Sequence, residues 1–132
     1  MSSILQKQIG IAAGNPQIVT TAELAAAYTG RCEVNTPTCR AIIKGWILIQ
    51  SGPGTTGVVL RIRRGNGLTG TVIAGGAVIA VAGAVMLDTS IKWAESLVNA
   101  EFADYTLTIV QLNATANGVV QYASIEVELI NG

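Results

Sequence analysis

The sequence predicts an all-β fold, an antiparallel sandwich or barrel of about eight strands in one domain. Runs rich in Val, Ile and Thr recur from residue 40 to residue 130, and turns containing Gly, Pro, Asn or Asp separate them. The chain has 132 residues, of which 50% are apolar and 15 are Gly. This length suffices for one hydrophobic core, and so high an apolar content excludes a disordered chain.

The amino end is expected to be an arm of residues 1–15, followed by a single domain of residues 16–132. The opening segment, M-S-S-I-L-Q-K-Q-I-G-I-A-A-G, has one Lys and a broken apolar pattern, so it lacks the features of a secretory signal. Gly10 and Gly14 weaken any helix there. Residues 18–21 and 31–35 are expected to form weaker strands, and residues 22–28 either one helical turn or a strand.

Two strands with clear alternation follow. Residues 40–50, R-A-I-I-K-G-W-I-L-I-Q, place Ile43, Gly45, Ile47 and Ile49 on one face. Residues 58–64, V-V-L-R-I-R-R, direct Leu60 and Ile62 inward and Arg61 and Arg63 outward. Turns are expected at residues 51–57 and 65–67.

The next third of the chain has weaker signals. Short strands are expected at residues 69–73 and 77–81, with residues 84–87 opening another element, and residues 88–103 form either a strand and a loop or one short helix. Residues 68–87 carry no charge and are long enough to cross a bilayer as a helix. Four Gly divide that run into pieces of strand length, so no membrane contact is expected and the span 68–87 stays the alternative.

The last two strands alternate clearly. Residues 104–112 place Tyr105, Leu107 and Ile109 on one face. Residues 114–118 have the composition of a hairpin turn. The final strand, residues 119–130, directs Glu126 and Glu128 outward and alternates them with Ile125, Val127 and Leu129.

The inventory of side chains excludes several functions. The chain has no His, which removes the commonest general base and metal ligand, so we expect no catalytic residues, no metal site and no enzyme. Eight basic and eight acidic residues balance to zero, so no nucleic-acid partner is expected. Only 12% of residues are charged, about half of the usual 25% or so, and charge-poor surfaces associate. These features indicate a subunit of an assembly.

The glycine motifs do not indicate a cofactor. G-x-G-x-x-G occurs at residues 52–57 and 65–70. A dinucleotide site needs a helix to begin at the third Gly, so that its amino end can hold the pyrophosphate. Strand-like or Gly-broken sequence follows both motifs, so both are expected to be turns.

Candidate interface residues are the basic cluster of Arg61, Arg63 and Arg64 and the two tryptophans, Trp46 and Trp93. The arginines form either a solvated strand face, paired with Glu126, Glu128 or Glu101, or an interface between subunits, because Arg makes bidentate pairs. A nucleic-acid contact is the weakest alternative for them. The tryptophans are expected to be core or interface anchors.

Cys32 and Cys39 flank the segment E-V-N-T-P-T, which contains a plausible turn. If the flanking residues pair as a hairpin, the two sulfurs meet as a local disulfide; otherwise both are free thiols. Two thiols without His are too few for a zinc site.

The segments I-I-K-G-W-I-L-I-Q, G-V-V-L-R-I-R-R-G, L-T-G-T, A-D-Y-T-L-T-I-V-Q and S-I-E-V-E-L-I follow one another between residues 42 and 130. In this order they resemble small single jelly-roll proteins of bacterial viruses, which include capsid decoration (cement), vertex and spike subunits. The layout is also similar to the C1q and tumour-necrosis-factor type of trimeric sandwich.

The resemblance implies a jelly-roll β-sandwich with a structural role. The expected protein is a capsid decoration or minor capsid subunit, a homotrimer that binds other capsid proteins in a virion assembled in the host cytoplasm. The alternative is a receptor- or carbohydrate-binding spike module on the same fold. Trp46, Trp93 and Tyr122 are the aromatic candidates for such a site.

Overall fold

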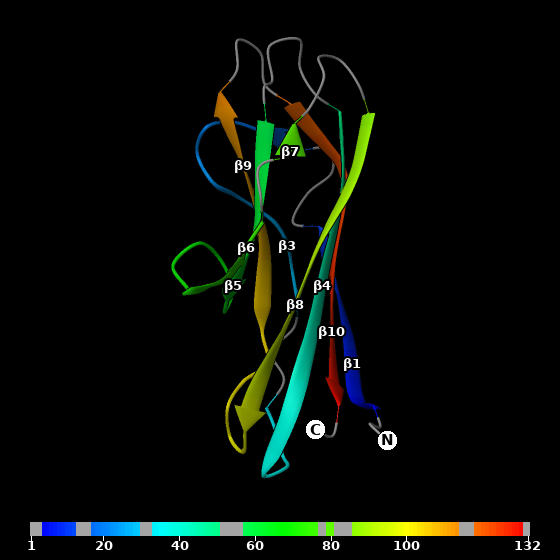
Figure 1. Cartoon of the computed structure of the whole chain (residues 1–132), viewed down its shortest axis with the longest axis vertical. Helices are drawn as coiled ribbons and strands as arrows, with labels where there is room; N and C mark the ends of the chain where they lie inside the picture. Colours follow the sequence, from blue (N-terminus) through cyan, green and yellow to red (C-terminus); the bar gives the residue numbers. More distant parts are fainter. Residues whose placement is uncertain are drawn as a thin grey trace.

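The computed structural model describes residues 4–12, 17–29, 33–50, 57–76, 79–80, 86–113 and 118–130, in which strands are the regular elements. The strands are β1 (Ile4–Ala12), β2 (Gln17–Val19), β3 (Leu24–Tyr28), β4 (Thr38–Gln50), β5 (Gly57–Arg64), β6 (Val72–Gly75), β7 (Ile79–Ala80), β8 (Met86–Val98), β9 (Tyr105–Asn113) and β10 (Gly118–Ile130) (Figure 1). Every pairing between them is antiparallel, which confirms the predicted fold class.

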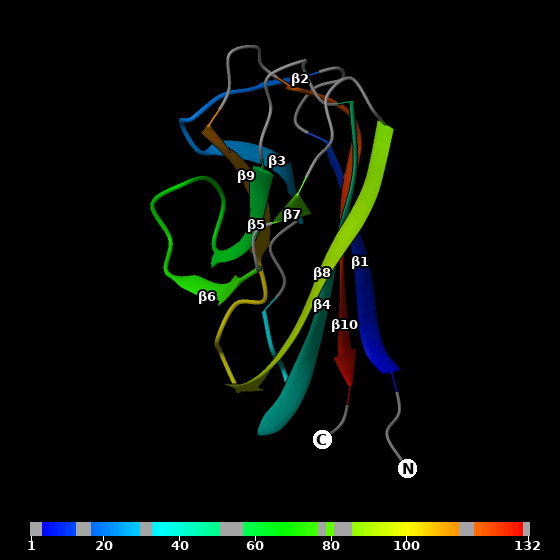
Figure 2. The ribbon, with the colours of Figure 1, turned by 45° about the horizontal axis from the view of Figure 1, so that its top comes forward.

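The strand order is that of a jelly roll. Hydrogen bonding follows the path β6-β5-β9-β3-β1-β10-β4-β8. The link between β1 and β3 is short, at Ile11–Tyr28 and Ala12–Ala27, so the path divides there into the sheets β1-β10-β4-β8 and β3-β9-β5-β6. The chain crosses between these sheets from β2 to β3, β3 to β4, β4 to β5, β7 to β8, β8 to β9 and β9 to β10 (Figure 2). Such crossings distinguish a jelly roll from two consecutive meanders.

The core lies between the two sheets. Ile43, Ile47 and Ile49 of β4 are fully buried, and a Cβ built on Gly45 would meet the side chain of Leu107 in β9. The faces predicted for the strands at residues 58–64, 104–112 and 119–130 are therefore confirmed, and in residues 40–50 the face of Ile43, Gly45, Ile47 and Ile49 is the one that enters the core. Their buried members include Leu60, Ile62, Tyr105, Leu107, Ile109, Ile125, Val127 and Leu129.

The expected amino-terminal arm is wrong for the residues that the structure describes. Residues 4–12 form β1, which lies between β10 and β3 within the sheet. The reason is backbone pairing: β10 satisfies one edge of β1 from Ile4 to Ile11, with Gly10 opposite Ile125. Gly10 weakens a helix but is tolerated in this strand. The other residues of the predicted arm, 1–3 and 13–15, lie outside the described ranges.

The segments with weak signals are mostly strands. Residues 24–28 form β3, which resolves the alternative between helical turn and strand. β8 extends to Val98 without a helix, because β4 offers it a partner along its whole length, from Gln50–Met86 to Thr38–Val98. The weak strand expected at residues 31–35 is represented, in the described part, by an isolated bridge between Glu33 and Phe102.

The charge-free run 68–87 contains the strands β6 and β7 and the start of β8. In the described part of the chain, no helix has the length and apolar character needed to cross a bilayer. The motif at residues 65–70 is a turn, as predicted: Gly65 and Gly67 have φ of 80° and 104°, and strand β6 follows it. The turns expected at residues 51–57 and 114–118 fall largely outside the described ranges.

Candidate functional site

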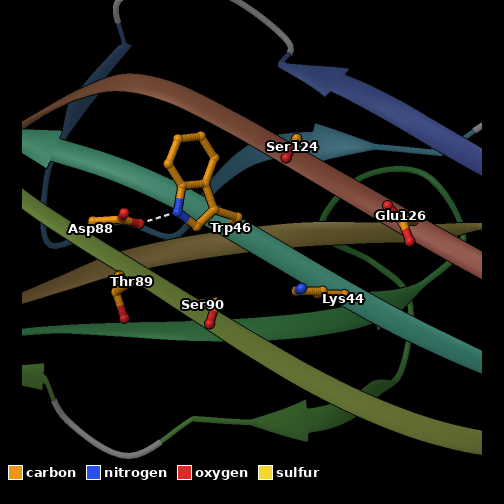
Figure 3. A pocket seen from close by; sticks show the side chains of 7 residues that line it. All are labelled: Lys44, Trp46, Asp88, Thr89, Ser90, Ser124 and Glu126. Atoms are coloured by element: carbon orange, nitrogen blue, oxygen red, sulfur yellow. Dashed lines mark hydrogen bonds between the residues drawn. The ribbon is translucent and has the colours of Figure 1, made fainter.

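A hollow of about 520 Å³ lies on the outer face of the sheet formed by β8, β4 and β10 (Figure 3). Its lining residues are Lys44, Trp46, Asp88, Thr89, Ser90, Ser124 and Glu126. Strand register places them together, since Trp46 lies opposite Ser124 of β10 and opposite Ser90 of β8. Directly opposite residues share one face of a sheet. The hollow is therefore a patch of mainly polar side chains from three neighbouring strands around one indole.

Trp46 is held in place by two neighbours. Its indole N–H donates a hydrogen bond to Oδ1 of Asp88 (Figure 3). Its ring centroid lies 5.1 Å from that of Tyr122, with the two planes tilted by 55°. Trp46 is half-buried and Tyr122 is 45% exposed, so the pair forms an aromatic wall that a ligand can reach. An oriented ring of this kind loses little conformational freedom when it binds a ligand.

The polar groups of the hollow offer both donors and acceptors. Asp88 and Glu126 carry carboxylates, Lys44 an ammonium group, and Ser90 and Ser124 hydroxyls. The two carboxylates outnumber the single ammonium group among these lining residues. The site therefore combines one aromatic ring with several hydrogen-bonding groups.

The sequence identified parts of this site without assembling them. Trp46 and Tyr122 were expected as aromatic candidates, and Glu126 as an outward-facing residue. Asp88, Ser90 and Ser124 were missed, because the register of β4 with β8 and β10 brings residues more than 40 positions apart onto one face. The sequence could show that these residues lie on the polar faces of their strands. It could not show which strands are neighbours, because alternation within a strand does not specify its partner.

The second candidate feature is the free edge of β8. This strand ends the hydrogen-bonded path, so one of its edges pairs with β4 and the other has no strand partner in the described residues. Met86 is 50% exposed, Trp93 47% and Val98 50%. Trp93 lies opposite Ile43, on the face turned toward the second sheet. Trp46 and Trp93, both expected as interface or core anchors, therefore lie on opposite faces of the same sheet.

Arg61 and Arg63 are bound to a carboxylate that the sequence did not indicate. Glu23 accepts two hydrogen bonds from Arg63, at 2.8 Å from Nε and 2.7 Å from a terminal nitrogen, and Arg61 lies 3.4 Å away. Thr108 donates to the same carboxylate at 2.5 Å. The hydrogen bond from Arg63 is the main reason why the pKa of Glu23 is lowered to about 2. This network attaches the segment before β3 to β5 and β9.

Arg64 belongs to a different network, which joins the two sheets. It contacts Glu95 of β8 at 2.5 Å, and the buried Tyr105 of β9 donates its hydroxyl to the other oxygen of Glu95 at 2.6 Å. Burial and this carboxylate raise the pKa of Tyr105. The three arginines were expected to pair with Glu126, Glu128 or Glu101. The ion pairs shown use Glu23 and Glu95 instead, because the fold covers the outer face of β5 with the segment before β3.

Cys39 is buried, and burial raises the pKa of its thiol. Cys32 lies outside the described residues, so the local disulfide between Cys32 and Cys39 stays a prediction. Among the described residues, no group of three Cys, Asp or Glu is arranged to hold a metal ion.

Comparison with known proteins gives a fold and no family. No family model matches the sequence, and no curated protein matches it. Among solved structures, the chain is similar to the structure of infectious bursal disease virus, Gx strain, with 12% identity and a TM-score of 0.54 over 93% of this chain and 32% of that one. The chain thus spans about a third of the length of the viral chain it matches. At this identity the likeness shows the fold alone.

Two other similarities are weaker. The crystal structure of the T13 particle of the same virus has a TM-score of 0.49 at 11% identity, over 95% of this chain and 34% of that one. A family 35 carbohydrate binding module from Clostridium thermocellum has a TM-score of 0.37 at 13% identity, over 95% of this chain and 97% of that one. The likeness to the Gx-strain virus structure supports the jelly-roll sandwich fold described above.

Proposed function

We propose that this protein is a non-enzymatic structural subunit that associates with itself and with a viral shell, as a decoration (cement) or minor capsid protein of a bacterial virus. The observation that carries the proposal is the free edge of β8, a strand of 13 residues with exposed Met86, Trp93 and Val98. The jelly-roll fold shared with a virus structure is compatible with this setting.

An unpaired strand edge presents a row of backbone N–H and C=O groups that another chain can satisfy by adding a strand. Monomeric proteins commonly keep such edges short or bury them, and β8 is among the longest strands described here. The apolar side chains along it add a hydrophobic gain to the backbone pairing. The edge therefore has the two components of a stable contact between subunits.

The geometry of the contact decides the symmetry of the assembly. Pairing of β8 with β8 of a second copy would be isologous and give a dimer, whereas pairing with a different edge is heterologous and gives a ring when the rotation between subunits closes, or an open filament when it does not. The homotrimer expected from the sequence belongs to the second class. In the virion, assembled in the host cytoplasm, such a ring would rest on other capsid proteins.

Native mass spectrometry at micromolar concentration tests self-association. We expect a trimer for the natural chain and a monomer for Trp93→Lys, which places a charge beside the β8 edge. Tyr122→Lys is the matched control, because Tyr122 is almost equally exposed but lies on β10, a strand paired on both edges, and it should leave the trimer intact. A natural chain that stays monomeric would overturn the proposal. Co-sedimentation with purified particles then tests binding to the shell.

The second candidate is the receptor- or carbohydrate-binding spike module. It requires an exposed aromatic and carboxylate surface, and the outer-face hollow has that composition, since Trp46 and Asp88 line it and Tyr122 packs against Trp46. Adsorption of the purified protein to host cells, with and without Trp46→Ala, tests this function directly. Loss of adsorption in the variant is expected, and equal adsorption would argue against the hollow as the binding site.

A further inference from the structure

We propose that Asn66 is a latent deamidation site, whose attacking group, the backbone nitrogen of Gly67, is held inactive by a hydrogen bond to Thr106. The loop that contains Asn66, residues 65–71, joins β5 to β6 and projects from the side of the sandwich (Figure 2). Asn66 is exposed and is followed by Gly, so local sequence and accessibility favour the reaction. The fold opposes it. This modification is independent of the proposed role as a structural subunit.

Deamidation of an Asn–Gly pair needs no enzyme. The backbone nitrogen of the Gly loses its proton and attacks the side-chain Cγ of the Asn, and the side-chain nitrogen leaves as ammonia. Water then opens the resulting succinimide ring at either carbonyl, which gives Asp or isoAsp. Gly favours the attack because it has no Cβ to obstruct it. At Asn66 the reaction would place a carboxylate in residues 65–87, a segment that carries no charge.

The nitrogen that must attack is already engaged in the folded chain. The N–H of Gly67 donates to Oγ1 of Thr106 at 3.0 Å, and the hydroxyl of Thr106 donates in turn to the carbonyl of Gly65 at 2.6 Å. Thr106 is fully buried, so breaking the bond from Gly67 leaves a buried acceptor without its donor, which is costly. While the bond lasts, the nitrogen of Gly67 keeps its proton and cannot turn toward the side chain of Asn66.

Backbone hydrogen bonds fix the loop on both sides of this contact. The N–H of Gly65 donates to the carbonyl of Asp104 at 2.8 Å, which attaches the start of the loop to the segment before β9. The N–H of Arg64 donates to the carbonyl of Thr71 at 2.9 Å, which closes the loop across its ends. Rearrangement toward a succinimide would break several of these bonds at once. The reactive conformation therefore requires local opening and is rarely populated.

Peptide mapping measures the modification at this residue alone. Trypsin cleaves after Arg64 and Lys92, and Asn66 is the only Asn or Gln between these two sites. During incubation at mildly alkaline pH, the mass change from amide to acid in that peptide gives the rate, and enzymatic methylation of isoAsp identifies the product. We expect the folded natural chain to react at least about tenfold more slowly than the same chain kept unfolded in guanidinium chloride.

Variants of β9 make the test specific. Thr106→Val keeps a side chain of similar shape but removes the acceptor, so it should raise the rate in the folded protein at least about fivefold. Thr106→Ser keeps the hydroxyl and should keep the natural rate. Thr108→Val is the matched control, because Thr108 is equally buried two residues further along β9 but donates its hydroxyl to Glu23 instead of the loop. Thermal unfolding of each variant shows that it is folded.

Faster deamidation in Thr106→Val alone, with the natural rate in Thr106→Ser and Thr108→Val, supports the proposal. Equal rates in the folded and unfolded natural chain overturn it, because the fold then does not restrain the reaction. A folded Thr106→Val variant that reacts at the natural rate overturns it too, as does equal acceleration in Thr108→Val. If Thr106→Val does not fold, hydrogen exchange at the amide of Gly67 in the natural chain decides: slow exchange supports the proposal, and exchange as fast as in an unfolded peptide overturns it.

Discussion

Gly45→Ala is the sharpest test of how the two sheets pack. Gly45 lies in the middle of β4, between the buried Ile43 and Ile47, and faces Leu107 of β9 in the other sheet. A Cβ at this position would lie 2.6 Å from Cδ1, 3.0 Å from Cδ2 and 3.2 Å from Cγ of Leu107. Carbon atoms pack comfortably at about 3.5–4.0 Å, so one sheet or the Leu107 side chain must move by roughly 1 Å.

The expected loss of stability follows from two opposing effects. Overpacking of a filled core costs about 1–3 kcal/mol. Replacement of Gly by Ala contributes about 0.4–1 kcal/mol of stability, because it restricts the unfolded chain. Leu107 is fully buried and has no solvent to move into, so the first effect is larger. Gly45→Ala should therefore lower the free energy of unfolding by about 1–2 kcal/mol, or Tm by roughly 5 °C.

Urea and thermal unfolding, at one fixed protein concentration, measure the effect. Leu107→Ala alone should cost about 2–5 kcal/mol because it leaves a cavity. In the double variant the new methyl group enters that cavity, so the combined cost should fall short of the sum by about 1 kcal/mol. Gly75→Ala is the matched control, since a Cβ there meets nothing within 4 Å, and it should change stability by less than about 0.5 kcal/mol. Additive costs, or a neutral Gly45→Ala, would refute face-to-face packing of β4 on β9.

Three further predictions concern titratable groups. The pKa of Glu23 is lowered from 4.5 to about 2, so the stability that its carboxylate contributes is complete above pH 4.5 and is lost as the pH falls toward 2. Glu23→Gln should lower the free energy of unfolding by about 1–2 kcal/mol at neutral pH. Urea unfolding between pH 2 and pH 4.5 should show a weaker pH dependence for this variant than for the natural chain, and an equal pH dependence would contradict the prediction. Tyr105→Phe removes the hydroxyl that donates to Glu95 and should lower the free energy of unfolding by about 1–2 kcal/mol, measured in urea. Because the pKa of Tyr105 is raised, ultraviolet titration of the folded chain should show one phenol fewer ionising near the usual tyrosine pKa than titration of the unfolded chain. Cys39 should react slowly with iodoacetamide until the protein is denatured, because its thiol is buried; mass analysis with and without reductant also shows whether Cys39 is bridged to Cys32.

The strands that could be predicted from the sequence are those whose alternation is strong and local. In β4, β5, β9 and β10 every second residue enters the core, and the period of two identifies both the element and its buried face. β1 and β8 could not be placed in the same way. β1 contains Gly10 and polar residues, and β8 mixes charged and apolar residues without a clear period, so both depend on long partners far along the chain.

The candidate site was less predictable than the fold for the same reason. Glu126 was correctly expected on an outward face and Trp46 as an interface or core anchor, but the contacts of Trp46 with Asp88 and Tyr122 depend on pairing between β4, β8 and β10. The partner of Arg63 shows the problem most clearly: Glu23 lies 40 residues earlier, in a segment with no strong signal of its own. The alternation within a strand shows which residues share a face of the sheet, but only the pairing between strands shows which residues meet in a site.

The low charge of the chain has two different physical causes in this structure. Residues 105–125 carry no charge, and alternation alone would turn half of such a strand toward solvent. In β9, however, Thr106 and Thr108 on the second face are also buried: Thr106 donates to the carbonyl of Gly65, and Thr108 donates to Glu23. β9 is thus covered on both faces from Tyr105 to Ile109 within one subunit, whereas Leu112 near its end is 49% exposed.

The edge strand β8 has the opposite pattern. It carries charged residues, yet Met86, Trp93 and Val98 remain about half exposed, and none of the described strands pairs with its outer edge. The proposed contact with a neighbouring chain would cover the apolar side chains exposed along this edge. The composition alone suggested that every charge-free segment of the chain contributes surface for association with another subunit. The fold adds a specific contact to that inference, the unpaired edge of β8, so a charge introduced at Trp93 should disrupt assembly where an equal charge at Tyr122 should not.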